Sequence, residues 1–215
     1  MTAVPVAARF GAAARRYEDH APVQRITAER LADDIALLPL PRHPRILEIG
    51  CGTGLLTRAL ARRIGPADWT VTDISPGMLA AAQSRPPPPG TVRYRLLDGE
   101  RPEGLPGGYD LICSSLAVQW FSDLNAGLGR LAALLAPGGR LAVATLAAGT
   151  FQEWRAAHRE AGLSAATPAY PPLDAIRPGV GNLTGGVRGE RLGHRRLHRR
   201  RPPAAPATSH SPAPG

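Results

Sequence analysis

Acidic side chains and glycines in the first half of the chain are spaced as a ligand site requires. Glu48 comes two residues before Gly50, which opens the segment Gly-Cys-Gly-Thr-Gly, and Asp73 and Asp98 each follow a later apolar stretch. Glycine lets the backbone approach a ligand closely, because it carries no Cβ. Carboxylates accept hydrogen bonds from ribose hydroxyls and from an adenine amino group. This combination predicts a site for an adenosine-type ligand.

Three parallel strands are needed to bring these groups together. Residues 46–49 have the pattern of a buried strand that runs into the glycine turn, and residues 55–64 then show helical spacing of Leu and Ile. Residues 69–73 and 92–96 have the pattern of the next two strands. Because the carboxyl ends of parallel strands meet at one edge of a sheet, we expect both aspartates beside the glycine turn.

Each of these features also has a plainer explanation. A glycine-rich turn between a strand and a helix occurs as plain structure, and Asp98 followed by Gly99 is a common turn pair. The dinucleotide fingerprint G-x-G-x-x-G does not fit, because its third glycine would fall at Leu55. Asp73 is also placed to lead the next helix, but Ser75 already supplies the N-cap of that helix. We therefore expect the Asp73 carboxylate to be free for a ligand.

The sheet continues beyond the third strand. Residues 109–115 and 140–146 have the pattern of a fourth and a fifth strand, with a predicted helix over residues 124–136 between them. Gln119 and Trp120 follow the fourth strand, at the edge where ligands bind in open α/β sheets. We therefore expect these two side chains to face a substrate.

The first 40 residues predict two helices ahead of the sheet. We expect residues 9–17 to form the first helix and a second helix, opened by Pro22, to run to residue 38. The polar tip of Tyr17 suits a functional role as well as a structural one. The second helix carries its predicted core stripe on Val23, Ile26, Leu31, Ile35 and Leu38.

Composition indicates a single globular domain. The chain has 215 residues, of which 43% are hydrophobic, enough for one sizeable core. The formal net charge is +9, but residues 177–215 hold eight arginines against Glu190, so the remainder is nearly neutral and we expect no nucleic acid as partner. Two cysteines, Cys51 and Cys113, suit a reduced, cytoplasmic protein. No apolar stretch approaches the roughly 18 residues of a membrane span. We expect a monomer with no metal and no membrane partner.

The character of the chain changes towards its C-terminal end. Residues 150–153, Thr-Phe-Gln-Glu, predict a capping box for a helix that runs to residue 161. From residue 177 onwards Gly, Pro and Arg recur without an aromatic residue or a periodic pattern. We expect residues 177–215 to be disordered. A basic arm for RNA or membranes is the functional alternative, which the lack of aromatic residues and of amphipathic phasing disfavours.

The order of these motifs resembles the core of class I S-adenosylmethionine-dependent methyltransferases over residues 45–147. The resemblance implies an α/β, Rossmann-like fold with a mostly parallel sheet, in which residues 41–176 form the core and residues 1–40 cap the cofactor site. It also implies S-adenosylmethionine as cofactor. The residues expected to contact it are Glu48, Gly50, Cys51, Gly52, Thr53, Gly54, Asp73, Ile74, Met78, Asp98, Gly99 and Ser114.

Two segments are more specific. Residues 10–17 with Gln24, and residues 114–120, Ser-Ser-Leu-Ala-Val-Gln-Trp, look like those of the malonyl-acyl-carrier-protein O-methyltransferases of biotin synthesis. That resemblance implies methylation of the free carboxylate of a malonyl thioester on an acyl carrier protein, with the segment around Tyr17 closing over the cofactor. Such a carboxylate is already ionised at neutral pH, so we nominate no proton-transfer residue. The expected lining of the acceptor site is Tyr17, Gln119 and Trp120.

The chain departs from this family at its end. Class I methyltransferases continue past the fifth strand into two further strands, whereas residues 177–215 offer none. We expect a sheet that is incomplete at the C-terminus, and a tail that comes from a truncated or frame-shifted reading. Two other hypotheses stay open: a methyltransferase for another small carboxylate or a quinone precursor, and an inactive remnant.

Overall fold

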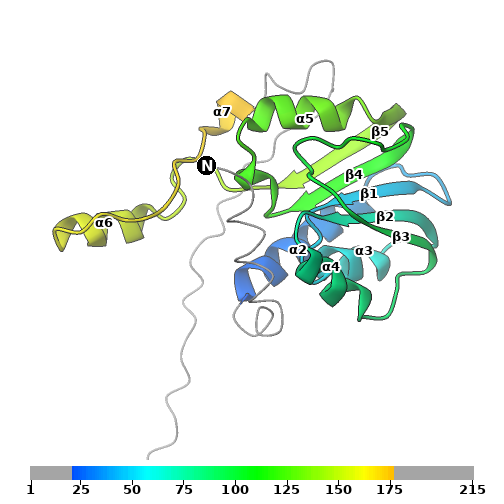
Figure 1. Cartoon of the computed structure of the whole chain (residues 1–215), viewed down its shortest axis with the longest axis horizontal. Coiled ribbons are helices and arrows are strands. Elements are labelled where there is room, and N and C mark those ends of the chain that lie inside the picture. The colour runs from blue at the N-terminus through cyan, green and yellow to red at the C-terminus, as the bar shows by residue number, and fades with distance from the viewer. Residues whose placement is uncertain (1–20, 177–215) are drawn as a thin grey trace, which may run out of the picture. The chain divides into compact units, whose positions relative to one another are not determined.

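Five parallel strands form one sheet in the computed structural model, which describes residues 21–176 (Figure 1). The predicted helix over residues 9–17, the side chain of Tyr17 and the predicted disorder of residues 177–215 lie outside the described residues. The strands are β1 (Arg45–Ile49), β2 (Ala67–Asp73), β3 (Gly90–Leu96), β4 (Tyr109–Ser115) and β5 (Leu135–Ala144).

The strand order is β3-β2-β1-β4-β5, and every neighbouring pair is parallel. The first strand, β1, is central. The chain then forms β2 and β3 on one side of β1, and β4 and β5 on the other side. Glu48 lies in register with Val71 of β2 and with Cys113 of β4. This arrangement confirms the predicted Rossmann-like sheet, and it puts the switch in strand order at the carboxyl end of β1.

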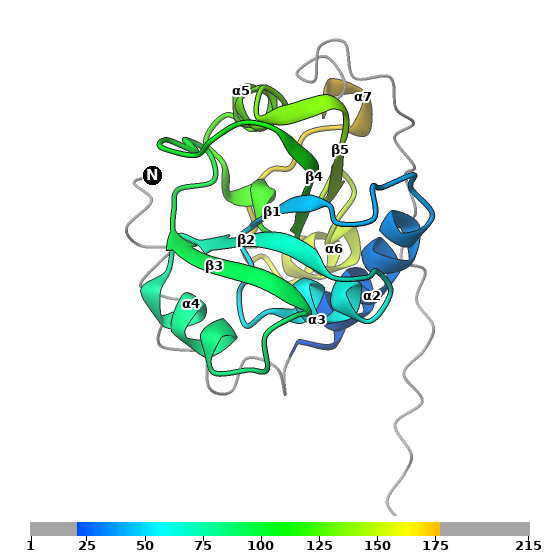
Figure 2. The same ribbon diagram turned by 90° about the vertical axis from the view of Figure 1, so that its right-hand side faces the viewer.

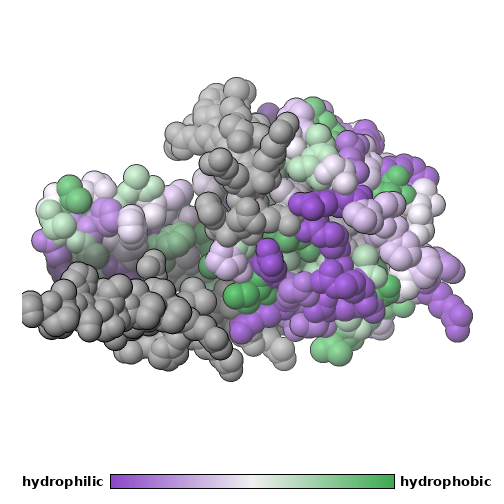
Figure 3. Space-filling view, turned by 90° about the horizontal axis from the view of Figure 1, so that it is seen from below, coloured by the Kyte–Doolittle hydropathy of each residue, from purple (hydrophilic) through white to green (hydrophobic). Residues whose placement is uncertain are grey.

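Helices cover both faces of the sheet (Figures 1 and 2). One side holds α2 (Pro22–Ala36), α3 (Leu55–Ala61) and α4 (Pro76–Gln83), and the other side holds α5 (Leu124–Ala132), which follows the short helix η2 (Val118–Trp120). Seen from the side on which α3 and α4 lie, hydrophilic residues cover much of the surface (Figure 3). The apolar sides of these helices therefore face the sheet. Two further helices, α6 (Gln152–Glu160) and α7 (Leu173–Ile176), follow β5.

Alternate residues of the central strands fill two separate cores. Ile46 and Trp69 are fully buried in the core on the side of α2, α3 and α4. Leu47 and Ile112 are fully buried in the second core, together with Leu131 of α5. Because successive side chains of a strand point to opposite faces, both faces of the central strands must be apolar, which is the pattern from which the strands were predicted.

The predicted core stripe of α2 is only half right. Leu31 and Ile35 are buried, but Val23 is 52% exposed and Ile26 is 48% exposed. The helix instead turns small residues towards α3 and the sheet, where a close approach of two helices favours short side chains. The buried residues of α2 are Thr27, Ala28, Leu31, Ala32 and Ile35.

The predicted boundary between α5 and β5 is wrong. The helix ends at Ala132 instead of residue 136, and β5 begins at Leu135, so residues 137–139, Pro-Gly-Gly, lie within the strand. An edge strand tolerates proline, because its outer N–H groups need no strand partner. The pairing of β5 with β4 is irregular here, and a Cβ on Gly139 would lie 2.7 Å from the carbonyl oxygen of Tyr109.

The predicted capping box of α6 is also wrong. The hydroxyl of Thr150 donates to the carbonyl oxygen of Ala147 at 2.7 Å, so it does not cap the helix. The N-cap residue is Phe151, which has a left-handed backbone with φ of 61° and no side-chain cap. The predicted N-cap of α4 is confirmed, since the Met78 N–H donates to the Ser75 hydroxyl at 3.4 Å.

The two isoleucines of α2 allow a matched test of which face of the helix is buried. Ile35 is fully buried and Ile26 is 48% exposed. We expect Ile35→Ala to lower the free energy of unfolding by about 2 to 5 kcal/mol, because it leaves a cavity in the core. Ile26→Ala should change it by no more than about 0.5 kcal/mol. Urea denaturation followed by circular dichroism measures both, and equal losses would contradict this assignment of faces.

Candidate functional site

The glycine turn after β1 is held in a conformation that suits glycine. Gly50 has φ of 66° and Gly52 has φ of 55°, both in the left-handed region. A Cβ on Gly50 would lie 2.3 Å from the Cβ of Ala117, so this glycine lets the loop after β4 approach the turn. A Cβ on Gly52 would have no atom within 4 Å. The turn is therefore closed on one side by Ala117 and open at Gly52.

Asp73 joins this turn to the end of β2. Its carboxylate accepts the N–H of Gly52 at 2.8 Å and the N–H of Ser75 at 2.8 Å. The expectation that this carboxylate is free is thus wrong, because both of its oxygens already accept a backbone donor. Each oxygen keeps capacity for a second donor. Burial raises the pKa of Asp73, while the N–H groups of Ser75 and Gly52 lower it.

The loop after β3 reaches the same edge. Asp98 accepts the N–H of Glu100 at 2.9 Å, so the turn that was one alternative for this residue is present. That bond uses Oδ1 of Asp98. A Cβ on Gly99 would lie 2.3 Å from a methyl group of Ile49, the last residue of β1. The structure therefore brings Asp98, Asp73 and the glycine turn together at the carboxyl ends of β1, β2 and β3.

Glu48 lies beneath the turn. The residue is 1% exposed, and its carboxylate accepts the hydroxyl of Thr57 in α3 at 2.5 Å. Burial raises the pKa of Glu48 to about 7, although the Thr57 hydrogen bonds lower it. The structure thus gives Glu48 a place between β1 and α3. Its direct contact with a ligand stays a prediction.

The loop after β4 carries strain and an unsatisfied acceptor. Leu116 has φ of 53°, unusual for a residue other than glycine, and such strain is concentrated at functional sites. Its carbonyl oxygen accepts the side-chain amide N–H of Gln119 at 2.7 Å. The Oε1 atom of Gln119 is buried and finds no donor among the described residues. Trp120, the other residue predicted to line a substrate site, is 46% exposed.

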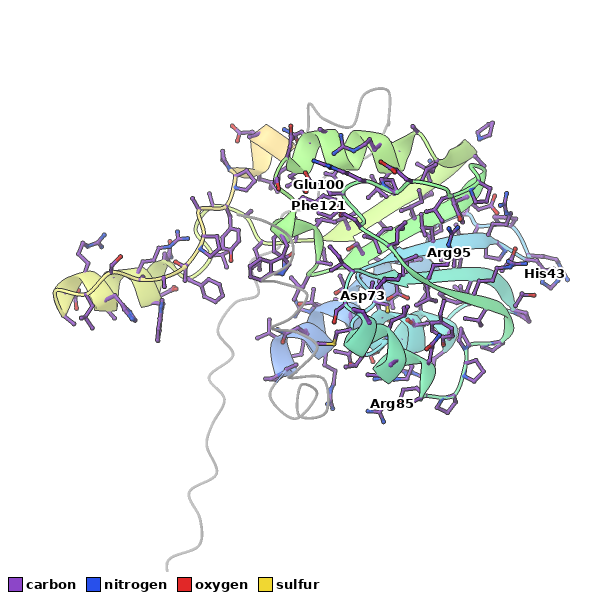
Figure 4. All side chains as sticks on the ribbon, viewed as in Figure 1. His43, Asp73, Arg85, Arg95, Glu100 and Phe121 are labelled. Atoms are coloured by element: carbon purple, nitrogen blue, oxygen red, sulfur yellow. The ribbon has the colours of Figure 1, made fainter. Side chains whose placement is uncertain are left out.

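Glu100 connects the loop after β3 to the loop after β4, and the sequence did not predict this role. Its carboxylate accepts the N–H of Ser122 at 2.8 Å and the N–H of Asp123 at 2.9 Å. Figure 4 shows Glu100 beside Phe121, at the same edge of the sheet as Asp73. These bonds join residues that lie more than 20 positions apart, so no local spacing could have indicated them. Glu100 is a positioning residue for both loops.

The remaining predicted residues surround the same turn. The N–H of Cys51 donates to the carbonyl oxygen of Thr72 at 2.9 Å, and burial raises the pKa of the Cys51 thiol. The hydroxyl of Ser114 donates to the carbonyl oxygen of Ile49 at 2.9 Å. Within residues 21–176, no group of three or more potential metal ligands is found, and no helix is long and apolar enough to cross a membrane. Cys51, Thr53, Met78 and Ser114 are buried, Ile74 is partly exposed, and Gly54 precedes α3.

Comparisons with known proteins agree with this geometry. Residues 47–141 match the family described as a methyltransferase domain. The chain is similar in fold to Streptomyces venezuelae DesVI, with a TM-score of 0.51 and 24% identity over 63% of this chain and 58% of that one. It has a TM-score of 0.54 and 23% identity with a chain in the Haloferax volcanii complex of the Trm112 methyltransferase activator and a methyltransferase, over 74% of this chain and 77% of that one.

The fold is similar to that of solved methyltransferases, and the family match lies within the sheet and its helices. Over 173 residues it is 42% identical to the malonyl-[acyl-carrier protein] O-methyltransferase of Magnetococcus marinus, covering 80% of this chain and 63% of that protein. Over 175 residues it is 63% identical to the biotin biosynthesis bifunctional protein BioCD of Bordetella avium, covering 81% of this chain and 37% of that protein. The chain thus spans less than two thirds of the length of either relative.

The raised pKa of Glu48 predicts a pH-dependent stability. A pKa of about 7 in the folded state against 4.5 means that the folded state holds the proton more tightly than the unfolded state between these values. The wild type should therefore lose stability as the pH rises from about 4.5 to about 7, by an amount on the order of 3 kcal/mol. Glu48→Gln cannot ionise at this position. Its free energy of unfolding relative to that of the wild type should therefore increase between pH 4.5 and pH 7.

Chemical denaturation at several pH values measures this difference. Glu103→Gln, at an exposed glutamate in the connection between β3 and β4, is the control for the removal of one carboxylate. A constant gap between Glu48→Gln and the wild type from pH 5 to pH 8 would show that the Glu48 carboxyl ionises alike in the folded and unfolded states.

Proposed function

We propose that the chain binds S-adenosylmethionine at the glycine turn and transfers its methyl group to the carboxylate of a malonyl thioester on an acyl carrier protein, in biotin synthesis. The observation that carries the first half is the meeting of the open turn at Gly52 with Asp73 and Asp98 at one sheet edge. The acceptor is proposed from the similarity to malonyl-[acyl-carrier protein] O-methyltransferases.

The residues at this edge fit the cofactor. Gly52 leaves room beside the backbone, since a Cβ there would meet no atom within 4 Å. Asp73 has the remaining acceptor capacity to bind ribose hydroxyls, and Asp98 can accept from the adenine amino group. The unsatisfied Oε1 of Gln119 offers one more acceptor for a ligand N–H or O–H group. S-adenosylmethionine supplies a methyl group on a positively charged sulfur.

In this reaction the protein acts mainly by positioning the acceptor carboxylate relative to the methyl group. A carboxylate is ionised at neutral pH, so the chain need not remove a proton from the acceptor. Holding two reactants in line supplies a large part of the barrier reduction in such displacements. The loops after β3 and β4, joined through Glu100, are the parts of the described chain that can fix the acceptor relative to the turn.

Methyl transfer tests the proposal directly. With radiolabelled S-adenosylmethionine and malonyl-carrier protein, we expect label on the carrier protein as a base-labile methyl ester. Acetyl-carrier protein, which lacks the free carboxylate, is the matched control and should stay unlabelled. If S-adenosylmethionine binds and malonyl-carrier protein gains no label while a free small carboxylate does, the acceptor is wrong. If neither binding nor transfer occurs with folded protein, the whole proposal is wrong.

The role of Asp73 in holding the cofactor can be tested separately. Asp73→Asn keeps the size of the side chain but removes its charge, and we expect weaker binding of S-adenosylmethionine by about 1 to 3 kcal/mol. The control is Asp68→Asn, the same change at the other end of β2, which should leave affinity unchanged. Isothermal titration calorimetry measures both. Equal affinities for Asp73→Asn and the wild type would make this carboxylate purely structural.

A further inference from the structure

A hollow lined by arginines lies on the face of the sheet opposite α4. The register pairs Thr70 with Arg93 and Thr72 with Arg95, so side chains of β2 and β3 line one face together. The hollow has a volume of about 260 Å³. The residues that line this arginine hollow are Arg45, Asp68, Thr70, Arg93, Arg95, Pro106 and Tyr109.

No helix of the described residues covers this part of the sheet. The connection from β3 to β4, residues 97–108, contains no helix, and α4 packs Leu79 and Ala82 into the core on the opposite face. Parallel sheets are normally covered on both faces. Here the side chain of Arg93 is 60% exposed, and Arg95 is exposed. This face of the sheet is therefore polar, exposed to solvent and accessible to a partner.

The charge of the hollow is positive. Arg95 donates to the carbonyl oxygen of Gly104 at 3.0 Å, and Arg45 donates to the carbonyl oxygen of Gly108 at 3.0 Å. Carbonyl oxygens orient the guanidinium groups but carry no net charge to cancel theirs. Arg93 pairs with Asp68 at 2.7 Å, and Asp68 is the one acid among the lining residues. Three guanidinium groups and one carboxylate thus line the hollow, and each guanidinium is held by the contact given above.

The hollow lies along β2 and β3, the strands that end at Asp73 and just before Asp98. Arg95 lies level with Thr72, one residue before Asp73, and Asp68 lies five residues before Asp73 along β2. At about 3.3 Å per residue, the distance along the strand from Asp68 to Asp73 is roughly 17 Å. Carrier proteins present their acyl group on a long flexible prosthetic arm. A carrier protein docked at the hollow can therefore deliver its thioester around the edge of the sheet to the glycine turn.

We propose that the arginine hollow is the docking surface for an acidic face of the acyl carrier protein. The inference rests on the proposed function for the identity of the partner, and on charge complementarity for the location. Complementary charges of this kind steer association and fix orientation more than they add affinity. Binding should therefore weaken steeply as salt is added.

Charge reversal tests the location. Binding of fluorescently labelled malonyl-carrier protein is followed by anisotropy at low salt, for the wild type and for the double variant Arg93→Glu/Arg95→Glu. We expect the double variant to bind at least about tenfold more weakly, because attraction becomes repulsion at two positions. The matched control is Arg85→Glu, which should bind as the wild type does. Arg85 is an exposed arginine that follows α4 and lies well apart from Arg95 in Figure 4.

Three further measurements make the outcome decisive. Thermal melts, with the neutral variant Arg95→Gln beside the double variant, show whether a loss of binding comes from unfolding. Methyl transfer to a short malonyl thioester without carrier protein should be unchanged in the double variant. Titration with inorganic phosphate separates a free-anion site from a protein docking site.

The outcomes for docking and for the proposed function are distinct. Equal carrier-protein binding by the double variant and the wild type overturns the docking surface, and so does binding of phosphate by a wild type that binds no carrier protein. Failure of methyl transfer with intact, arginine-dependent carrier binding overturns the acceptor chemistry and leaves the docking surface in place.

Discussion

One carboxylate holds the carboxyl edge of the sheet together. Asp73 accepts the N–H of Gly52 from the turn after β1 and the N–H of Ser75 from the start of α4. It is 7% exposed, and a carboxylate so buried is stable in its ionised form only when donors replace the lost water. The two backbone groups are those donors. The conformation of the glycine turn and the start of α4 are thus fixed by the same side chain.

The rest of the edge is assembled from contacts that require small residues. Gly50 packs against Ala117, and Gly99 packs against Ile49. A Cβ on either glycine would clash with this neighbour. These contacts attach the loop after β4 and the loop after β3 to the end of β1. Glu100 then ties the two loops to one another through backbone N–H groups. The apolar cores fix the strands, whereas glycines and carboxylates fix what lies at their ends.

Sequence reasoning succeeded where the physical cause is local. Residues 109–115 were predicted as a strand from their apolar run, and β4 has these bounds. Asp73 was placed beside the glycine turn because parallel strands end at a common edge, and its bond to Gly52 follows from that geometry. The N-cap at Ser75 was also predicted, because a cap depends on a few neighbouring residues.

It failed where tertiary contacts decide. The buried face of α2 includes Ala28 and Ala32. Alanine is only weakly hydrophobic, so a search for large apolar residues misses this face, although its small side chains suit close packing. Leu116 has a left-handed backbone, and its N–H donates to the carbonyl oxygen of Ala144 in β5, a partner 28 positions away in the sequence. A carboxylate that captures distant backbone N–H groups, as Glu100 does, has no characteristic spacing in the sequence. The expectation that Asp73 is free failed for the same reason, because its donor Gly52 lies 21 positions away in the sequence.

The electrostatics of the turn bear on the rival explanation of the glycines as a dinucleotide site. A pyrophosphate needs the N–H groups of such a turn as donors, together with a positive potential. Here the N–H of Gly52 is already bound by Asp73, and Glu48 lies buried close by. The charge of Asp73 raises the pKa of Glu48, though less than burial does, and Arg58 opposes both effects. The charge of Asp73, joined by that of Glu48 where it ionises, repels an anion and favours a cation. The turn is therefore suited to a ligand whose reactive centre is positively charged, as a sulfonium is, and ill suited to a diphosphate.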